Sequence, residues 1–314
     1  MKNRYFDALI YLIIIVFAVL LFFGGPDYHS SRSFKSAWNL GHIIFYTFLT
    51  AVLLHKWGYL KKKDPFFQLV LVFLISFFSG LGIEWIQVHF SRIAEFGDLW
   101  RNTLGALAGW LFFSQRLSKF SQKNLLAARI LLIFLIFLEI MAPVSSLRDE
   151  YRAYQEFPIF SDFERKSELK RWESDNRMSI SNNPVCKGDF SCRVLLTTEK
   201  YSGIFLKYFP KDWSEYNYLK FSIYNTENEH IQITCRIHDR LHVMTGEKYE
   251  DRFNKRFKLI PGWNHISISL DEVREAPLNR RMQLDDIFGF GLFSVELKKP
   301  VEIYIDDVRL SITA

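Results

Sequence analysis

The sequence has only three cysteines, and no two of them form a C-x-x-C pair or a His/Cys cluster with metal-ligand spacing. It also has no G-x-S-x-G, no P-loop and no dinucleotide-binding fingerprint. Each of those sites requires its residues at a fixed spacing. The sequence therefore lacks the common zinc, serine-hydrolase and nucleotide-binding motifs, and no catalytic motif identifies a reaction.

Long apolar runs are scarce in residues 151–314 and abundant in residues 1–146. The length of 314 residues suits about two domains. The net charge is +6, but many of the basic residues lie in short loops between apolar runs. That placement favours membrane topology over a nucleic-acid interface, where basic residues gather among aromatic ones. We expect no nucleic-acid partner.

The apolar runs predict a helical membrane bundle. A membrane span needs about 20 mostly apolar residues. The first run follows Lys2 and Arg4, and the alternative is a cleaved signal peptide. We interpret it as a retained anchor because its apolar core is long and further runs follow. The predicted spans are 5–23, 37–55, 66–88, 98–113 and 127–146.

Basic loops predict the orientation of these spans. Lysines 61–63 follow the second span, and Arg116, Lys119 and Lys123 follow the fourth. Loops rich in Lys and Arg face the cytoplasm, so we expect a cytoplasmic amino terminus and an extracytoplasmic carboxyl-terminal half. The orientation reverses if residues 98–113 do not cross the membrane.

Polar residues follow one face of the fourth predicted span. Asp98, Asn102, Gly105 and Gly109 are separated by four, three and four residues, which places them in one helical stripe. The two glycines form a G-x-x-x-G, which lets a neighbouring helix approach closely. This spacing predicts helices packed through small residues, with polar groups at one end.

Polar side chains on three predicted spans fall at a similar depth. We expect Asp98 to pair with His42, and Glu84 to pair with Arg92 or Arg101, while Glu139 on the fifth span could join them. Charged groups at membrane depth are costly and mark candidate functional sites. The alternative is that they lie near the interface as polar contacts and caps, with Asp98 capping its helix.

At these residues the sequence resembles the VanZ-like family over about the first 125 residues. His42 and Tyr46 on the preceding helix also fit the family pattern. The resemblance implies a small helical membrane domain of the bacterial envelope, and the name-giving member is linked to glycopeptide antibiotic resistance. The matching pattern is Glu84, Gln87, Arg92, Asp98, Asn102, Gly105 and Gly109.

The remaining sequence predicts an all-β domain. Residues 147–157 form a polar link out of the membrane domain, and residues 158–314 follow it. Apolar and polar residues alternate over 219–224, 231–238 and 301–306, with turn signals between such runs. This pattern predicts an antiparallel β-sandwich.

Five pieces of this half carry a further resemblance: DFE (162–164), GDFSCRV (188–194), YNYLKFSIYN (216–225), PGWNHISISL (261–270) and YIDDVRL (304–310). Their order resembles a carbohydrate-binding-module-like or galactose-binding-like jelly roll. In such modules the first and last strands often share a structural calcium, and Glu164 and Asp306 are the matching carboxylates. The alternative is that both are ordinary exposed acids. The resemblance implies a sugar partner, for which the candidate aromatic residues are Trp172, Tyr201, Tyr208, Trp213, Tyr216, Tyr218 and Tyr224.

All three cysteines fall in this second half, which we expect to be extracytoplasmic. An oxidising compartment permits a Cys186–Cys192 disulfide across a short hairpin, and the alternative is that both remain free thiols. Cys235 has the alternation of a buried strand residue and should stay free.

These patterns favour an envelope membrane protein. We expect the β-sandwich to bind a cell-wall or exopolysaccharide glycan, and the membrane domain to contact lipid and engage a lipid-linked envelope molecule. Two alternatives remain open. One is an intramembrane enzyme or transporter that uses His42, Glu84 and Asp98, and the other is a purely structural membrane anchor.

Overall fold

The structure, a computed structural model, describes residues 2–22, 25–27, 30–89, 96–174 and 178–314. The chain divides into two compact units, Met1–Leu147 and Arg148–Ala314. The buried core of the second unit draws only on side chains between Phe160 and Leu310. That unit therefore has its own hydrophobic core, as an independently folding domain does.

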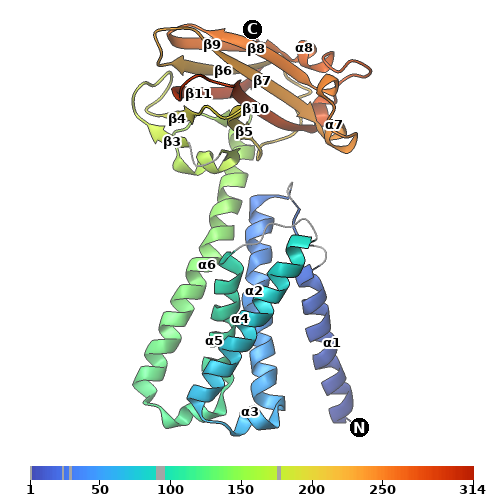
Figure 1. The fold of residues 1–314 in the computed structure, drawn as a ribbon, viewed down its shortest axis with the longest axis vertical. Coiled ribbons are helices and arrows are strands. Elements are labelled where there is room, and N and C mark those ends of the chain that lie inside the picture. Colours follow the sequence, from blue (N-terminus) through green and yellow to red (C-terminus); the bar gives the residue numbers. More distant parts are fainter. Residues whose placement is uncertain (1, 23–24, 28–29, 90–95, 175–177) are drawn as a thin grey trace. The chain divides into compact units, whose positions relative to one another are not determined.

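Helices form the first unit, and polar residues set where they begin. Ser31 Oγ accepts a hydrogen bond from Phe34 N at 3.2 Å, and Asp64 Oδ1 accepts one from Phe67 N at 3.0 Å. Pro65 follows at the first helical position, where no N–H is needed. The helices are α1 (Lys2–Phe22), α2 (Arg32–Lys56), α3 (Gly58–Lys62), α4 (Pro65–His89), α5 (Phe96–Phe113), the short η1 (Gln115–Lys119) and α6 (Gln122–Glu156) (Figure 1).

Three helices in the described part of the chain are long and apolar enough to cross a membrane: Arg32–Lys56, Pro65–Ile86 and Gln122–Glu156. The predicted count of five spans is not confirmed. Among the residues of α1 whose side chains are described, the continuous apolar stretch is Asp7–Phe17. The fourth predicted span corresponds to α5, a continuous helix of 18 residues. Charged residues near the start of α5 interrupt its apolar sequence.

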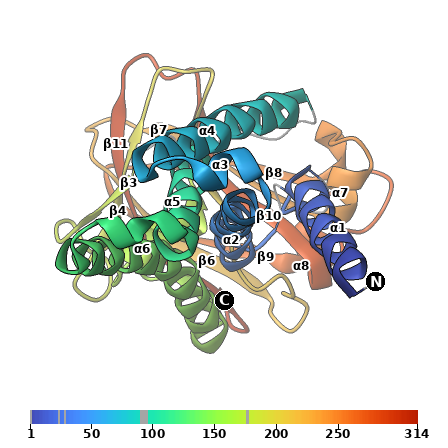
Figure 2. The same cartoon turned by 90° about the horizontal axis from the view of Figure 1, so that it is seen from below.

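Glycines allow α5 to pack closely against α2. A Cβ atom added at Gly105 would lie 2.5 Å from the Ile43 carbonyl oxygen, and one at Gly109 would lie 2.5 Å from Thr50 Cβ. Thr47 Oγ1 also donates to the Gly105 carbonyl at 3.1 Å. The backbones of α2 and α5 therefore pack against each other at close range. Figure 2 shows α2 and α5 between α1 and α6.

Two antiparallel sheets form the second unit. In the described residues, the six-stranded sheet has the order β3-β4-β11-β6-β9 with β1 beside β11, and the five-stranded sheet has the order β2-β5-β10-β7-β8. The strands are β1 (Ile159–Ser161), β2 (Trp172–Glu173), β3 (Met178–Ser181), β4 (Ser191–Leu196), β5 (Tyr201–Leu206), β6 (Tyr218–Asn225), β7 (Ile231–Asp239), β8 (Phe253–Leu259), β9 (Gly262–Ser269), β10 (Ile287–Val295) and β11 (Val301–Ser311). Short helices connect them: η2 (Lys166–Arg171), α7 (Arg240–Met244), η3 (Tyr249–Asp251), α8 (Leu270–Arg274) and η4 (Leu284–Asp286).

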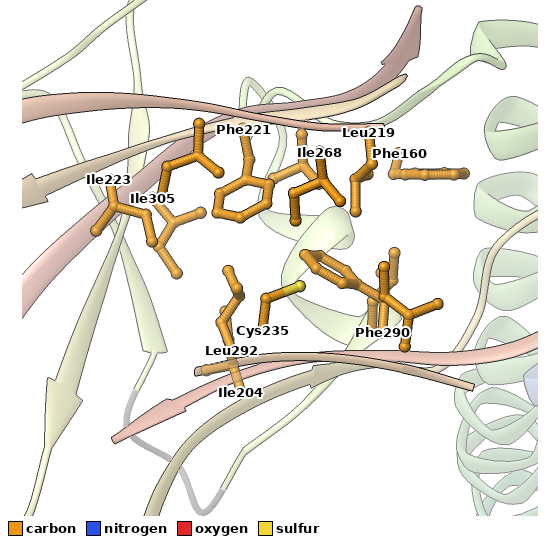
Figure 3. Packing of buried hydrophobic residues seen from close by; sticks show 14 of the residues in the cluster. Phe160, Ile204, Leu219, Phe221, Ile223, Cys235, Ile268, Phe290, Leu292 and Ile305 are labelled. Carbon is orange, nitrogen blue, oxygen red and sulfur yellow. The ribbon is translucent and has the colours of Figure 1, made fainter. Parts of the chain in front are cut away.

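Alternating apolar residues from both sheets meet in the core of the sandwich. Figure 3 shows Phe221 and Ile223 of β6 facing Cys235 of β7 and Leu292 of β10. Alternate residues of a strand point to opposite faces, so the polar residues between them lie on the outer faces. The predicted antiparallel β-sandwich is confirmed, and its outer faces are where a ligand could bind.

The predicted polar link is helical as far as Glu156, because α6 continues through it. A buried ion pair fixes this part of α6 to the sandwich. The guanidinium of Arg171 donates to both carboxylate oxygens of Asp149 at 3.2 Å and to the Phe160 carbonyl at 2.7 Å. Arg171 and Asp149 are 1% and 3% exposed, so solvent does not weaken the pair.

The cysteines are free thiols, so the candidate Cys186–Cys192 disulfide is not formed. The side chain of Cys192 points into the core of the sandwich, next to Ile305 on β11. Cys186 lies outside that core, with its sulfur 4.0 Å from His265 Nδ1. Cys235 is fully buried between the sheets.

Candidate functional site

Polar side chains from three helices meet within the first unit. His42 of α2 lies between two residues of α5: its Nδ1 is 2.8 Å from Asn102 Oδ1, and its Nε2 is 3.4 Å from Asp98 Oδ2. Arg101 donates to Asp98 Oδ1 at 2.6 Å and to Glu139 Oε2 of α6 at 3.0 Å. We call these five residues the membrane polar cluster.

The other predicted members of this cluster are placed as follows. Glu84 is buried on α4, and Tyr46 of α2 bonds Ser79 of α4 with an oxygen–oxygen distance of 2.9 Å. Arg92 lies outside the described residues, and so does the side chain of Gln87. Gly80 of α4 faces Asn102, because a Cβ there would lie 2.5 Å from Asn102 Nδ2.

The membrane polar cluster is more than a helix cap. The Asp98 carboxylate contacts the imidazole of His42, which is buried, and the guanidinium of Arg101, which is partly buried. A carboxylate next to an imidazole can orient the ring, as general acid–base sites require.

Glu164 and Asp306 do not fit a calcium site. Glu164 Oε1 accepts hydrogen bonds from the backbone N–H groups of Asp189 and Phe190 at 2.9 and 3.1 Å. Asp306 Oδ2 accepts from the N–H groups of Cys186 and Lys187 at 2.9 and 3.0 Å. Calcium takes oxygen ligands, whereas these carboxylates face N–H donors. They hold the loop before β4, and the described residues contain no group of three or more His, Cys, Asp or Glu suited to a metal.

The candidate aromatic residues divide between the core and the surface. Trp172 and Trp213 are buried in the core, and Tyr216 packs against it. Tyr224 lies on the outer face of the six-stranded sheet, where its ring centroid is 5.4 Å from that of Trp263. Tyr201 is 62% exposed at the start of β5, in the five-stranded sheet.

The outer face of the five-stranded sheet carries an aromatic floor. A Cβ at Gly289 or Gly291 of β10 would collide with the ring of Phe205. The Phe205 ring therefore lies over backbone that has no side chains of its own. Phe293 of β10 is on the same face, with its ring centroid 5.9 Å from that of Tyr201. Phe205 also stacks on His238 of β7, with centroids 5.7 Å apart and planes 24° apart.

Polar atoms without hydrogen-bond partners border this floor. Arg236 is in register with Gly291 on one side and with Asn254 on the other. The atoms Arg236 Nε, His238 Nδ1 and Asn254 Oδ1 are buried and make no hydrogen bond within the described structure. Buried polar atoms are usually paired, so such a group next to aromatic rings is typical of a ligand site.

A buried ionic network that no sequence pattern predicts lies beside this face. His238 and Asp239 at the end of β7 are both buried. Burial alone would raise the pKa of Asp239, but hydrogen bonds from Arg280 and from the N–H groups of Gln283 and His242 lower it. Arg280 also bonds Asp251. The network fixes the end of β7, and Arg280 lies too far along the chain for spacing to reveal it.

A protein-family model matches part of the chain. Residues 8–119 match the family model VanZ/LLP1, which confirms the predicted resemblance there. No curated protein sequence matches the chain significantly.

Solved structures resemble about half of the chain. An exo-beta-agarase has 16% identity and a TM-score of 0.40 over 50% of this chain, which spans 25% of that protein's length. The family 11 carbohydrate-binding module from Clostridium thermocellum, in complex with a β-1,3-1,4-mixed-linked tetrasaccharide, has 18% identity and a TM-score of 0.37, covering 49% of this chain and 94% of that module. The family 30 carbohydrate-binding module of a cellulosomal cellulase from the same organism has 19% identity and a TM-score of 0.34, covering 45% and 86%. The chain thus combines a region that matches the VanZ/LLP1 family with an antiparallel β-sandwich similar to carbohydrate-binding modules.

Proposed function

We propose that this chain is an envelope membrane protein whose β-sandwich binds a glycan on the outer face of the five-stranded sheet. The observation that carries the proposal is the aromatic floor, with Phe205 over glycine backbone and Phe293 on the same face, bordered by unpaired polar atoms. The apolar face of a sugar ring packs on an aromatic ring, while its hydroxyls need hydrogen-bond partners. The floor and its border supply both.

The opposite sheet offers a weaker site. Its outer face has an aromatic pair, Tyr224 and Trp263, but the polar groups nearby bond one another. Tyr304 Oη donates to Glu302, and Arg193 forms an ion pair with the same carboxylate. Those groups would have to give up existing bonds to bind a sugar. The five-stranded sheet therefore provides the better site.

The membrane unit would hold the sandwich at the cell surface and engage a lipid-linked envelope molecule. The membrane polar cluster supports this second part, because it gathers the ionisable side chains of His42, Asp98 and Arg101 on packed helices. The basic loop at Lys61–Lys63 favours an extracytoplasmic sandwich. Both domains would then act on the same outer surface.

The glycan proposal is tested with the full chain in phosphatidylcholine nanodiscs. We expect saturable binding to at least one member of a panel of cell-wall fragments and polysaccharides. Phe205→Ala should weaken that binding at least about tenfold because it removes the floor. Trp263→Ala removes an aromatic side chain from the other outer face and should bind as wild type does. Equal loss in both variants, or no binding by the folded protein, would refute the proposal.

A second candidate function is catalysis or transport within the membrane. The short contacts of His42 with Asp98 and Asn102 favour it. In that case Asp98→Asn would abolish a change in lipid-linked glycans, measured by mass spectrometry, while the protein level stays normal. Unchanged lipids in cells with and without the chain would count against this candidate.

A further inference from the structure

Positive charge gathers along one side of the aromatic floor. The register of β7 and β8 pairs Thr234 with Arg256 and Gln232 with Lys258, and these residues alternate with the inward-facing ones. Both basic side chains therefore lie on the same outer face as Arg236. Arg252, just before β8, adds a fourth positive charge.

Two of these guanidinium groups lack an anionic partner. Other arginines of the sandwich are paired: Arg171 with Asp149, Arg240 with Asp286, and Arg280 with Asp239 and Asp251. Among the described residues, Arg236 and Arg252 form no hydrogen bond or ion pair, although the Nε atom of each is buried. Both residues are otherwise part-exposed, and the Arg252 guanidinium lies over the Tyr249 ring, 5.2 Å from its centroid. Both guanidinium groups are therefore open to an external anion.

The titration behaviour of neighbouring groups agrees with this geometry. Burial and the charge of Arg252 lower the pKa of Arg236. Burial, together with Arg236, His242 and Arg252, lowers the pKa of His238 to about 3, and Asp239 opposes this effect only in part. Glu247 is the nearby carboxylate that attracts both Arg236 and Arg252. The positive charges of Arg236 and Arg252 therefore act on each other and on His238. Glu250, Glu272 and Glu275 lie on the side of Arg252 and Asn254 where those two residues line a pocket.

We infer that the glycan bound on this face is acidic, a polysaccharide that carries carboxylate or sulfate groups, with its charge held by Arg236 and Arg252. This inference rests on the proposed glycan-binding function and names the ligand class. A sugar ring would pack on Phe205, and its anionic group would reach the adjacent Arg236. Asn254 Oδ1 would accept a hydrogen bond from a hydroxyl group. Guanidinium groups suit this role because they bind planar carboxylates through two hydrogen bonds.

Matched polymers test the inference in the full chain in phosphatidylcholine nanodiscs. Polygalacturonate is compared with its methyl ester, and dextran sulfate with dextran, so that each pair differs only in charge. We expect at least one charged polymer to bind at least about tenfold more tightly than its neutral form, with an affinity that falls as salt rises. Arg236→Gln and, independently, Arg252→Gln should remove that preference.

Arg193→Gln is the control, because it removes one positive charge from the other sheet. An equal effect of Arg193→Gln and Arg236→Gln would overturn the inference, since it would indicate a diffuse charge effect. Equal affinity for the charged and neutral polymers would also overturn it. The inference would also be overturned if the protein bound double-stranded DNA as tightly as it binds the best polysaccharide.

The result also separates this inference from the proposed function. Binding of neutral glycans that is lost in Phe205→Ala and unaffected by Arg236→Gln would refute an acidic ligand and leave glycan binding intact. Absence of binding to every polymer by the folded protein would refute both. Normal thermal unfolding of each variant shows that a loss of binding does not come from a loss of fold.

Discussion

Burial of His238 couples the stability of the sandwich to pH. Its side chain is 4% exposed, and burial next to Arg236, His242 and Arg252 lowers its pKa to about 3. The unfolded chain takes up this proton near the ordinary histidine value of about 6.5. Stability that is present above pH 6.5 is therefore lost as the pH falls toward 3.

We expect this residue to cost the domain about 1.4 kcal/mol of unfolding free energy between pH 7.5 and pH 5.5. Denaturant unfolding of residues 148–314 at the two pH values measures the loss. His238→Phe should reduce the pH-dependent loss by about that amount, whereas His230→Phe, at an exposed position, should not. If the unfolding free energy of His238→Phe depended on pH as that of the wild type does, buried His238 would not be the neutral group assigned here.

Individual residues also show where prediction from sequence succeeds. His42 and Asp98 were expected to pair because helical depth can be counted from the ends of apolar runs, and the structure places them 3.4 Å apart. Glu164 and Asp306 were candidate metal ligands, but each accepts backbone hydrogen bonds. A carboxylate looks the same in sequence whether it faces a cation or an N–H group, so the sequence could not distinguish the two.

At the scale of elements, α5 depends on the absence of side chains where it meets α2. A methyl group at Gly105 would lie 2.5 Å from a backbone oxygen and 2.9 Å from Tyr46 Cβ, neither of which can move freely. We expect Gly105→Ala to destabilise the helical unit, although alanine favours helices over glycine by about 1 kcal/mol.

Thermal denaturation in detergent, followed by size-exclusion chromatography, measures this effect. Gly41→Ala on α2 and Gly82→Ala on α4 are matched controls, because a Cβ at either position meets no atom within 4 Å. They should be neutral or stabilising. A Gly105→Ala protein as stable as these controls would show that α2 and α5 are not packed this closely.

Strand periodicity predicted the sandwich but not its aromatic floor. Alternation placed Phe221 and Ile223 in the core, and they lie there. Phe205 was not among the predicted aromatic candidates. The glycines of G-F-G at residues 289–291 were an available signal, since glycine inside a strand marks a place where another group approaches the backbone. Which group approaches depends on the neighbouring strand, and the sequence alone does not give strand order.

At the scale of the whole molecule, the function depends on which side of the membrane the sandwich occupies. We expect a protease-cleavable tag after Ala314 to be cut by protease added to intact cells. The same tag beside Lys62 should be cut only after the cells are permeabilised. The reason is that lysine-rich loops remain in the cytoplasm. The reverse pattern would place the sandwich in the cytoplasm and would remove surface glycans as its ligands.

The binding face itself is the central claim, and hydroxyl-radical footprinting of the full chain, with and without a saturating glycan, tests it most directly. We expect the glycan to protect Tyr201, Phe205 and Phe293 on the five-stranded sheet. Oxidation of Tyr224 and Trp263 on the other sheet should be unchanged. Protection of Tyr224 and Trp263 with no change at Phe205 would contradict the account.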